Sequence, residues 1–412
     1  MTQIYRSRWN RNFFISLACY LRDAIVLALP IKRLPKILIR LLYGVDAKFA
    51  FLVHPRFYQD VYISSPFLNP LKFILRKKTA YKFLSRMPPF VLNSVRTKQG
   101  ADGFVVAQIT LPELMSEERK YTISVMEKSL KLVSKITREG AVVGLGGWLP
   151  MISRRGAALE KCAEKLGLKI TNGHCGTLTS IYLTIEKLAQ IGGINMKELS
   201  IAIIGVGKMG TNVARALKNK VGELFLIDIN KNNLGKIKNE LKLAGDLRTR
   251  VETLLNDPRD MVPLRNILKK CHIGVCTTSA YRKILRVNDM PDGFIAIDDA
   301  RPEALPRDPK NERLVLEGGL LKIKDAIINY DYGFGLDNNV FGCLGEAFML
   351  ALSNGENLKP TLGDVDIQNF LNMLNFSREN GVLAGDLKSS EDFISHEDVK
   401  EAFFRRGFIQ NE

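Results

Sequence analysis

A glycine-rich run between a strand pattern and a helix pattern constrains this chain more than any other feature. The run Gly205-Val-Gly-Lys-Met-Gly210 follows the apolar segment 200–204, and helical apolar spacing resumes over residues 213–217. In this spacing the first glycine permits a tight turn, the second admits a pyrophosphate, and the third allows close helix–strand packing. The helix start then offers free N–H groups to phosphate. The run predicts a Rossmann-type dinucleotide-binding domain, whose cofactor-binding loop consists of Gly205, Val206, Gly207, Lys208, Met209 and Gly210. The alternative is a glycine turn without a ligand.

An acidic residue at the end of the next strand pattern supports this prediction. Asp228 closes the apolar segment 223–227. A carboxylate at this position accepts hydrogen bonds from the ribose hydroxyls of the adenosine and repels a 2′-phosphate. We therefore expect NAD(P)H as cofactor with NADH slightly favoured, although Asn230 and Lys231 just beyond weaken that preference. Thr277, Thr278 and Ser279 follow the fourth strand pattern and are expected to contact the cofactor.

Strand and helix patterns alternate along most of the chain, which predicts an α/β fold with mainly parallel sheets. An N-terminal α/β substrate domain is followed by a doubly wound Rossmann-type domain and a C-terminal helical segment. The predicted strands are 49–53, 104–109, 141–145, 200–204, 223–227, 250–254, 272–276, 294–297 and 314–316. The predicted helices are 117–138, 154–166, 179–191, 343–352, 367–376 and 397–404. We expect the parts to divide as 1–44, 45–195, 196–330 and 331–412.

The positive charge of the chain is concentrated at its N-terminal end. The first 100 residues contain 18 Lys and Arg against three acidic residues, whereas the remaining 312 residues contain 42 against 40. A basic end attracts acidic partners such as an anionic membrane, nucleic acid or an acidic protein. The alternative is that the charge only increases solubility. Helix-turn-helix, zinc-finger and RNA-binding signatures are missing from the sequence, so nucleic acid is not an expected partner.

Residues 1–44 have the pattern of a basic amphipathic N-terminal extension. Apolar residues recur at helical spacing from Phe13 to Ala28, Arg22 and Asp23 interrupt them, and Pro30 ends the pattern. The apolar stretch is shorter than the roughly 20 residues that a membrane span requires. An amphipathic helix with Lys and Arg on its polar face can lie in a membrane interface. We expect either peripheral contact with an anionic membrane or a helix that packs on its own domain.

The cysteines indicate a reducing compartment and no metal site. The six cysteines are scattered without a C-x-x-C pair, which is not a disulfide framework. Cys271, His272 and Cys276 have the residue types of metal ligands but lack a matching second half, so no metal site is predicted. We expect a cytoplasmic protein that is peripheral, if membrane-associated, on the inner face of the cell membrane.

Cys343 is the most informative of the cysteines. It lies in Asn338-Asn-Val-Phe-Gly-Cys-Leu-Gly-Glu346, between small and polar residues and a helix-forming run. This context places the sulfur in the first turn of a helix, where the dipole and free N–H groups stabilise a thiolate and activate it as a nucleophile. The alternative is a buried cysteine that serves as a small hydrophobic residue.

From about residue 49 to residue 376, the chain resembles the long-chain acyl-(acyl carrier protein) reductases, which make fatty aldehydes. The resemblance rests on Phe51-Leu-Val-His54, Leu111-Pro-Glu-Leu-Met115, Gly144-Leu-Gly-Gly-Trp148, Thr171-Asn-Gly173, Thr177-Leu-Thr179, Ile297-Asp298 with Arg301-Pro302, Gly318-Gly319 and Phe341-Gly-Cys343-Leu-Gly-Glu-Ala347. In that family a cysteine in the last motif carries the acyl group. The chain departs from the family in its cofactor loop and at Asp228, where the family has a basic residue and prefers NADPH.

The resemblance implies reduction of a long-chain acyl thioester to an aldehyde through an acyl-Cys343 intermediate. An oxyanion donor would then be needed, and His54 and the backbone N–H groups of Gly146 and Gly147 are the candidates. The alternatives are that His54 only caps a strand and that the glycines only permit a turn. Thr177 is a further predicted substrate-binding residue. The implied partners are acyl carrier protein or acyl-CoA, and the first of these would be attracted by the basic N-terminal end.

Two other functions remain open. The first is an NAD(P)-dependent dehydrogenase of a small polar substrate, similar in plan to shikimate and amino-acid dehydrogenases. It would need an acid–base pair rather than a cysteine, and Lys208 and Asp331 are available. The second is a non-enzymatic nucleotide-binding protein associated with a membrane. Fold alone does not choose among these functions.

Overall fold

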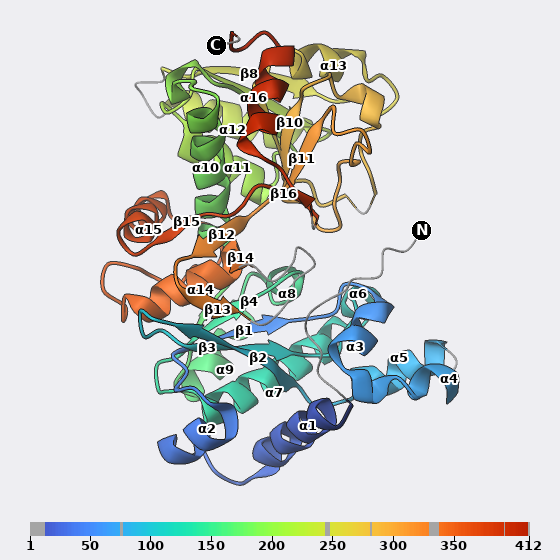
Figure 1. Ribbon diagram of the computed structural model, residues 1–412, viewed down its shortest axis with the longest axis vertical. Helices are drawn as coiled ribbons and strands as arrows, with labels where there is room; N and C mark the ends of the chain where they lie inside the picture. The colour runs from blue at the N-terminus through green and yellow to red at the C-terminus, as the bar shows by residue number, and fades with distance from the viewer. Residues whose placement is uncertain are drawn as a thin grey trace. The chain divides into compact units, whose positions relative to one another are not determined.

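The computed structural model describes residues 13–74, 77–243, 248–280, 282–328, 338–390 and 392–410. The chain forms two compact units. Unit 1 comprises residues 1–176 and 323–381, and unit 2 comprises residues 177–322 and 382–412. The chain leaves unit 1 within helix α10 (His174–Ile191), returns at the end of strand β12 (Leu320–Ile323) and passes into unit 2 again after Gly381. Figure 1 shows the elements of each unit.

Unit 1 is built on a mixed sheet with the strand order β13-β2-β3-β1-β4-β5. Strands β3, β1, β4 and β5 run parallel, whereas β2 is antiparallel to both of its neighbours. The bounds are β1 Phe49–Val53, β2 Phe90–Thr97, β3 Gly103–Ala107, β4 Val142–Leu145, β5 Lys169–Thr171 and β13 Ala326–Ile328. Every residue of β1, β3 and β4 is buried, as expected of parallel strands that are covered on both faces.

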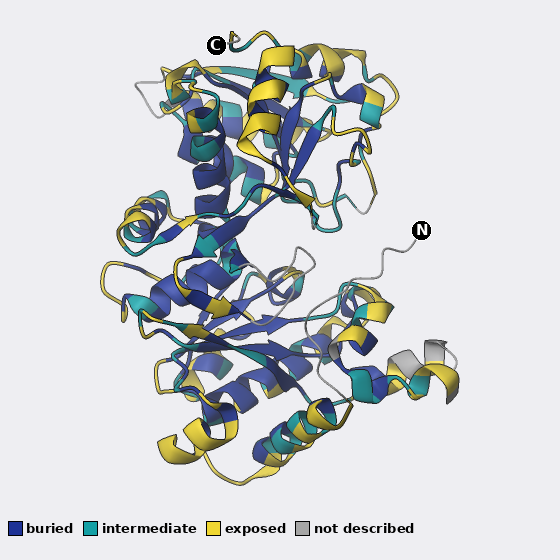
Figure 2. Ribbon diagram, in the orientation of Figure 1, coloured by how far each residue is buried: buried dark blue, intermediate teal, exposed yellow. Residues whose placement is uncertain are grey.

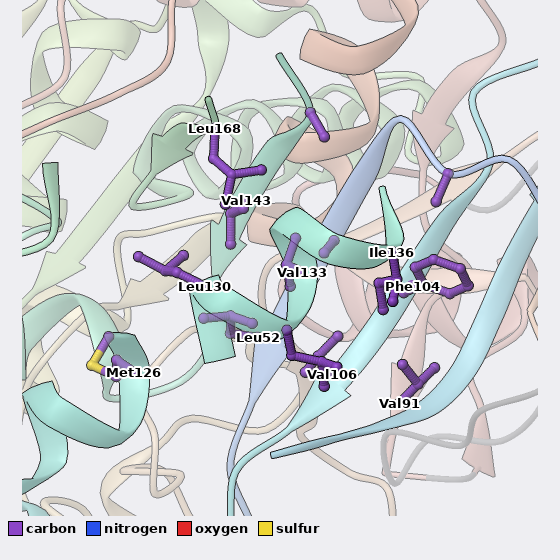
Figure 3. Packing of buried hydrophobic residues seen from close by; sticks show 14 of the residues in the cluster. Leu52, Val91, Phe104, Val106, Met126, Leu130, Val133, Ile136, Val143 and Leu168 are labelled. Atoms are coloured by element: carbon purple, nitrogen blue, oxygen red, sulfur yellow. The ribbon is translucent and has the colours of Figure 1, made fainter. Parts of the chain in front are cut away.

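Helices cover this sheet and supply its core. On α7, apolar residues face the strands at helical spacing through Met126, Leu130 and Val133, and they belong to one core with Leu52 and Val106 (Figure 3). The helices of unit 1 are α1 Phe13–Ala28, α2 Lys36–Tyr43, α3 Tyr58–Ser64, η1 Pro66–Leu68, α4 Leu71–Ile74, α5 Lys77–Ser85, α6 Pro112–Glu117, α7 Arg119–Ile136, α8 Leu149–Ile152, α9 Glu160–Lys165, α14 Gly342–Leu352 and α15 Ile367–Glu379. Strand β14 (Asn339–Phe341) leads into α14.

Unit 2 contains a parallel sheet with the strand order β11-β10-β9-β6-β7-β8. Counted within the unit, this is the order 6-5-4-1-2-3 of a doubly wound dinucleotide-binding fold. The bounds are β6 Ser200–Ile204, β7 Glu223–Asp228, β8 Arg250–Leu255, β9 Ile273–Cys276, β10 Ile295–Asp298 and β11 Leu314–Glu317. In Figure 2 the sheet strands of both units are largely in the buried colour.

Helices and short strands complete unit 2. They are most of α10, η2 Met196–Glu198, α11 Lys208–Leu217, α12 Lys231–Leu243, α13 Val262–Leu268, η3 Val287–Asp289, α16 His396–Arg405, β15 Val382–Ala384, β16 Lys388–Ser389 and β17 Asp392–Phe393. The last helix begins with the capping box expected from Ser395 and Asp398. Because the six strands of this sheet run parallel, the loops that follow them lie at the same, carboxyl edge of the sheet.

The predicted α/β class is confirmed, and each predicted strand has a counterpart within two residues at either end. The sequence patterns missed the antiparallel strand β2 and the short strands β5 and β12 to β17. Helix α10 begins at His174 rather than at residue 179, and only 160–165 of the predicted helix 154–166 is helical. The expected boundaries at 195 and 330 also differ from the observed division. The first part of unit 1 ends within α10, at residue 176, and the segment 323–381 belongs to unit 1.

The expected N-terminal extension is part of unit 1 where it is described. Val26 of α1 and Ile39 and Tyr43 of α2 belong to the same buried core as Leu52 and Val106. Helices α1 and α2 therefore pack on their own domain, and peripheral contact with a membrane remains a prediction. Among the described residues, no helix is both long and apolar enough to cross a membrane.

Candidate functional site

The glycine loop of unit 2 has a shape that only glycine permits at two positions. Gly205 has a φ of 90°, and a Cβ there would lie 2.8 Å from the Cα of Thr278. A Cβ at Gly210 would lie 2.2 Å from the carbonyl oxygen of Gly205. At Gly207, in contrast, a Cβ would meet nothing within 4 Å. The loop therefore packs tightly against the protein at Gly205 and Gly210, and we call it closed there. At Gly207 no protein atom lies close to the position of a Cβ, and we call the loop open there.

This open side is where helix α11 begins. Gly207 is its N-cap residue and Lys208 its first residue, and both are exposed. A helix N-terminus combines free N–H groups with the positive end of the helix dipole, which favours an anionic group. The tight turn, the open glycine and the helix start together fit the pyrophosphate of a dinucleotide. Val206, which is buried, and Met209, which is half-buried, complete the predicted loop.

Asp228 is tied to this loop. Its Oδ2 accepts a hydrogen bond from the N–H of Val206 at 2.7 Å, and its Oδ1 accepts one from the N–H of Asn230 at 2.7 Å. Each carboxylate oxygen has a second acceptor position, so these bonds leave capacity for ribose hydroxyls. The structure places Asp228 against the glycine loop, and its contact with a ribose remains a prediction.

The segment 277–279 also lies against the loop. The Oγ1 of Thr277 donates to the carbonyl of Gly205 at 2.7 Å, and Thr278 packs against Gly205. Ser279 is exposed. Thr277 and Thr278 therefore support the turn itself, and contacts of these three residues with a cofactor remain a prediction.

A second group of predicted residues gathers in unit 1, at the carboxyl edge of its parallel strands. His54 follows β1, Gly146 and Gly147 follow β4, and Gly173 follows β5. Because β1, β4 and β5 are parallel neighbours, these residues lie on the same edge of the sheet. This edge is the usual place for ligand sites in α/β sheets.

Cys343 stands at the start of two helices on this edge. It is the second residue of α14, and its side chain is half-buried. Gly173, with a φ of 77°, directly precedes α10, and a Cβ on it would lie 2.2 Å from the Cβ of Cys343. A residue larger than glycine at 173 would therefore displace the predicted nucleophile. The prediction that Cys343 lies in the first turn of a helix is confirmed.

Glu346 is a buried carboxylate beside this cysteine that the sequence prediction did not include. Its Oε2 accepts from the N–H of Gly176 at 2.8 Å, and its Oε1 accepts from the N–H of Thr361 at 3.2 Å and contacts the hydroxyl of Thr171. Burial raises the pKa of Glu346, and these hydrogen bonds oppose that rise. Its position three residues after Cys343 was the available signal, because residues so spaced share one helix face.

His54 is held in one tautomer by its neighbours. Its Nε2 accepts from the N–H of Trp148 at 3.0 Å, so the ring proton resides on Nδ1 and is donated to the carbonyl of Pro55 at 3.0 Å. Burial lowers the pKa of His54 to about 4. The ring is therefore neutral near pH 7, and both ring nitrogens have protein partners. These contacts agree with the capping alternative, and an oxyanion-donor role remains a prediction.

The two predicted glycine donors differ in this structure. The N–H of Gly146 donates to the carbonyl of Leu52 at 2.9 Å, so it is already used within the sheet edge. Gly147 is exposed with a φ of 57°, and a Cβ on it would lie 2.4 Å from the Nε2 of His54. Close packing against His54 explains the glycine at 147, and Gly146 does not fit the donor role that was predicted for it.

Thr177, the remaining predicted substrate-binding residue, belongs to unit 2. It surrounds Gly319 together with Ser180 and Asp299. A Cβ at Gly319 would lie 2.8 Å from the Oδ1 of Asp299 and 3.7 Å from both the Oγ of Ser180 and the Cγ2 of Thr177. A hydroxyl, a methyl group and a carboxyl group therefore converge here, at the carboxyl end of β10.

Asp299 is a titratable residue that the sequence prediction passed over. Burial and the neighbouring Asp298 raise its pKa to about 7, although Arg301 opposes the rise. A carboxyl group with such a pKa can donate or accept a proton near neutral pH. Its position directly after Ile297-Asp298, two residues before Arg301, was the signal in the sequence.

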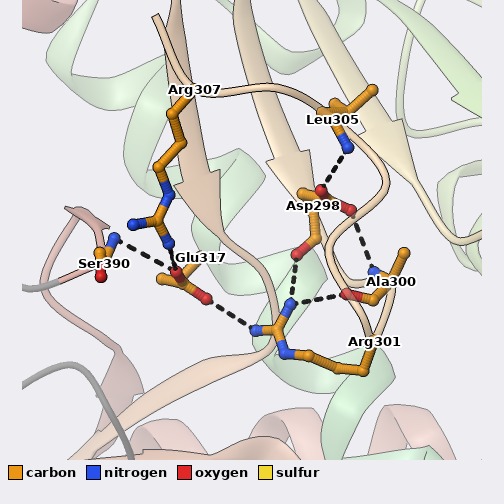
Figure 4. A network of polar contacts seen from close by, with 7 residues as sticks. All are labelled: Asp298, Ala300, Arg301, Leu305, Arg307, Glu317 and Ser390. Atoms are coloured by element: carbon orange, nitrogen blue, oxygen red, sulfur yellow. Dashed lines mark hydrogen bonds and ion pairs between the residues drawn. The ribbon is translucent and has the colours of Figure 1, made fainter. Parts of the chain in front are cut away.

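A polar network fixes the loop that carries Asp299 (Figure 4). Arg301 donates to the carbonyls of Asp298 at 3.1 Å and Ala300 at 2.8 Å and to Glu317 at 2.8 Å. The carboxylate of Asp298 accepts from the N–H groups of Ala300 and Leu305. Glu317 also pairs with Arg307 and accepts from the N–H of Ser390. With all these partners within the protein, the network holds the backbone on both sides of Asp299.

Metal ligands do not cluster in the described part of the chain, where no group of three or more His, Cys, Asp or Glu could hold an ion. Cys271 instead donates to the carbonyl of Ile267, and the Nδ1 of His272 accepts from the N–H of Ser200. The predicted residues thus form two groups, one in each unit. Asp331, considered as an acid–base residue, lies outside the described residues.

No family model and no curated protein matches this chain. Solved structures with similarity include L-tryptophan dehydrogenase from Nostoc punctiforme, which is 11% identical over 88% of each chain with a TM-score of 0.34. Shikimate 5-dehydrogenase from Thermus thermophilus is 17% identical over 81% of this chain and 99% of that chain, with a TM-score of 0.34. A dipicolinate synthase chain from Bacillus halodurans is 16% identical over 43% of this chain, with a TM-score of 0.26, and only 56% of that chain is covered. The fold class rests on the strand order and not on these similarities.

Proposed function

We propose that this chain is an NAD(P)H-dependent oxidoreductase. The observation that carries the proposal is the glycine loop between β6 and α11, which is closed by Thr278 at Gly205 and open at Gly207. A reduced nicotinamide bound there would supply a hydride. The fluorescence of the reduced nicotinamide offers a direct binding assay, and the proposal fails if neither NADH nor NADPH binds.

The coenzyme preference depends on Asp228. Its carboxylate, held by Val206 and Asn230, supports NADH because it repels a 2′-phosphate. The variant Asp228→Ser is expected to weaken NADH binding and to narrow the difference in dissociation constant between NADH and NADPH. Equal affinities for both coenzymes in the unmodified protein would contradict the preference.

For the substrate, we propose an acyl thioester that is reduced to an aldehyde through Cys343. The thiolate attacks the carbonyl carbon, the bond between this carbon and the carrier sulfur breaks, and the carrier leaves as a thiolate that takes up a proton from water. The starts of α14 and α10 beside Cys343 favour the negative charge of the thiolate. After reduction by the hydride that a bound reduced nicotinamide would supply, the carbon–sulfur bond to Cys343 breaks, an aldehyde is released and the Cys343 thiolate is restored.

The proposed donors of the acyl group are acyl carrier protein or acyl-CoA. Both are anionic, and the basic charge of the first 100 residues supports either by electrostatic steering. Turnover measured with the two thioesters at low and raised salt separates them. A rate that depends steeply on salt only with the carrier protein supports protein recognition.

The test of the acyl proposal is the mass of the protein after incubation with an acyl thioester and no coenzyme. We expect one added acyl group on Cys343, which peptide mapping locates, and none in Cys343→Ala. Cys162→Ala is the matched control, because Cys162 is also a half-buried cysteine in unit 1 but its pKa is raised by burial. Acylation of the control at full level supports the proposal, whereas absence of acylation of the unmodified chain by several thioesters refutes it.

A second candidate function is supported by Asp299. A dehydrogenase of a small polar substrate needs a proton donor or acceptor near the nicotinamide end of the sheet, and Asp299 lies at the carboxyl end of β10 with a pKa of about 7. Asp299→Asn and Cys343→Ala discriminate the two functions. Loss of turnover in Asp299→Asn with full activity in Cys343→Ala supports the small-substrate dehydrogenase and refutes the acyl reductase.

A further inference from the structure

Helix α1 turns its apolar residues outward. Phe14, Ala18, Leu21, Ile25 and Ala28 are spaced four and three residues apart, so they share one face of the helix. All five are exposed, with Phe14 at 75% and Ile25 at 61%. A helix on the surface of a globular protein normally shows the reverse arrangement, with its apolar face buried.

Polar residues of the same helix point inward and fix its orientation. The carboxylate of Asp23 is fully buried and accepts from the N–H of Val91 at 2.7 Å and the hydroxyl of Tyr43 at 2.8 Å. Arg22 pairs with Asp23 and donates to the carbonyl of Leu42 at 2.8 Å. Lys135 caps the far end of the helix through the carbonyls of Val26, Leu27 and Leu29. These bonds prevent α1 from rolling its apolar face onto the core.

Helix α2 repeats the arrangement next to α1. Its inward residues, Ile39 and Tyr43, belong to the core that also contains Val26 of α1. On its opposite side, Ile37 is 80% exposed and Leu41 is 77% exposed, and Leu38 and Leu42 are also exposed. In Figure 2, α2 is mostly in the exposed colour. Because both helices pack inward on one core, their apolar faces point away from it. We call this surface the α1–α2 apolar face.

Positive charge borders this face. Lys36 and Arg40 of α2 and Arg138 share the single carboxylate of Asp46, at 3.1, 3.3 and 2.6 Å. Arg138 and Lys36 lower the pKa of Asp46 to about 2. One negative charge therefore faces three positive ones. Lys32 is exposed between the two helices.

We propose that the α1–α2 apolar face docks on the surface of an anionic lipid bilayer. Large aliphatic and aromatic side chains suit the boundary between headgroups and acyl chains, and the bordering Lys and Arg suit anionic headgroups. A second copy of the chain would bring the same positive border against itself, which opposes a symmetric dimer. The charge alone would also suit an acidic protein, whereas Ile37 and Leu41, which are 80% and 77% exposed, suit acyl chains. This proposal does not depend on the reaction that the chain catalyses.

The test is co-sedimentation of the full chain with vesicles of phosphatidylcholine, with and without phosphatidylglycerol. We expect binding that requires phosphatidylglycerol and that weakens at raised salt. In the double variant Ile37→Glu, Leu41→Glu we expect binding to weaken by about tenfold or more, because two inserted side chains are replaced by charges that anionic headgroups repel. Both positions are largely exposed, so the thermal midpoint should not change.

The matched control is Val262→Glu, Leu255→Glu in unit 2. These two aliphatic side chains are about half exposed, at 56% and 52%, and the variant carries the same change in charge. We expect its vesicle binding to equal that of the unmodified chain. Equal loss in both variants would mean that net charge alone drives binding and would overturn the proposal, as would full binding by Ile37→Glu, Leu41→Glu.

A fluorescence measurement keeps the proposal testable if the double variant does not fold. In Phe14→Trp, lipid insertion should shift the emission to shorter wavelength on anionic vesicles and expose the new indole to quenching by brominated acyl chains. Cross-linking and sedimentation without lipid test the other occupant. The proposal is overturned if the chain does not bind vesicles but forms a stable dimer that Ile37→Glu, Leu41→Glu disrupts. The face would then be the contact with a second copy.

Discussion

Two loops in this chain have the same order of strand, glycine with positive φ and helix, but they differ in the atoms that surround them. In unit 2, strand β6 is followed by Gly205 with a φ of 90° and then by helix α11. In unit 1, strand β5 is followed by Gly173 with a φ of 77° and then by helix α10. The first loop is open at Gly207, whereas Cys343 fills the space against Gly173 in the second.

The difference is also electrostatic. Each helix start attracts a negative group through its N–H groups and its dipole. At α11 these groups face the exposed side of the loop, which suits a pyrophosphate from outside. At α10 the chain provides the acceptors itself, because Glu346 accepts from the N–H of Gly176 and Asn172 accepts from the N–H of His174. The same turn thus suits ligand binding in one unit and the positioning of Cys343 in the other.

The largest expected effect is that of Gly173→Ala on stability. A methyl group there would combine a left-handed backbone with a Cβ only 2.2 Å from the Cβ of Cys343. We expect the free energy of unfolding to fall by about 2–5 kcal/mol, from backbone strain and overpacking together. Urea denaturation measures it. In a Cys343→Gly background the loss should be smaller, since the clashing Cβ is absent.

The control for this variant is Gly207→Ala in the open loop. With a φ of −73° and no atom within 4 Å of its Cβ, it should unfold at the same urea concentration as the unmodified chain. If Gly173→Ala and Gly207→Ala had the same free energy of unfolding, Cys343 would not pack against Gly173 as described. The comparison of the two loops would then be wrong.

Glu346→Gln tests the internal acceptor. A glutamine amide provides one acceptor oxygen, so either Gly176 or Thr361 would lose the acceptor for its buried N–H. An unsatisfied buried donor costs about 1–3 kcal/mol, which is the loss of stability we expect from urea denaturation. Glu164→Gln, on the exposed side of α9, is the control and should be neutral. If Glu346→Gln left the free energy of unfolding unchanged, Glu346 would not be the required acceptor for the N–H groups at the start of α10.

Gly207→Ala is also the test of the open loop as a ligand site. Its methyl group has space in the protein and would meet only a bound pyrophosphate. We expect the dissociation constant for NADH to rise by about tenfold, which corresponds to about 1.4 kcal/mol. Hydrogen exchange should show protection of the first turn of α11 by NADH in the unmodified chain. Unchanged affinity in the variant would place the coenzyme elsewhere.

The two loops were not equally visible in the sequence. The loop of unit 2 is contiguous from Gly205 to Gly210, and its second partner, Asp228, follows at the end of the next strand. Local turn chemistry and strand alternation therefore predicted the fold of unit 2 and the position of Asp228. The surroundings of Cys343 come from β5, α10, α14 and Thr361, which are up to 190 residues apart. No local pattern reports such contacts.

Buried polar groups were the other limit of sequence-based prediction. Asp23 interrupts an apolar run and looks like the exposed side of α1, yet it is fully buried because Val91, Tyr43 and Arg22 satisfy it. His54 was a candidate oxyanion donor, but its ring bonds to Trp148 and Pro55 become visible only when β1 and β4 are neighbours. The sequence shows which residues are polar, whereas their partners depend on the fold.

The smallest expected effect concerns Asp299, a group with a pKa of about 7 against an ordinary value of 3.8. Between these two values the folded chain keeps a proton that the unfolded chain has released, so stability falls as the pH rises through this window and is constant above it. Asp299→Asn cannot titrate and should remove this fall, whose slope stays below about 1.4 kcal/mol per pH unit. Asp299 as a whole is half-buried, and screening by solvent reduces the slope further. Urea denaturation of both proteins across the window, with Asp392→Asn at an exposed position as control, measures the slope. If the two slopes were equal, Asp299 would titrate as an ordinary carboxylate and would lose its role in the second candidate function.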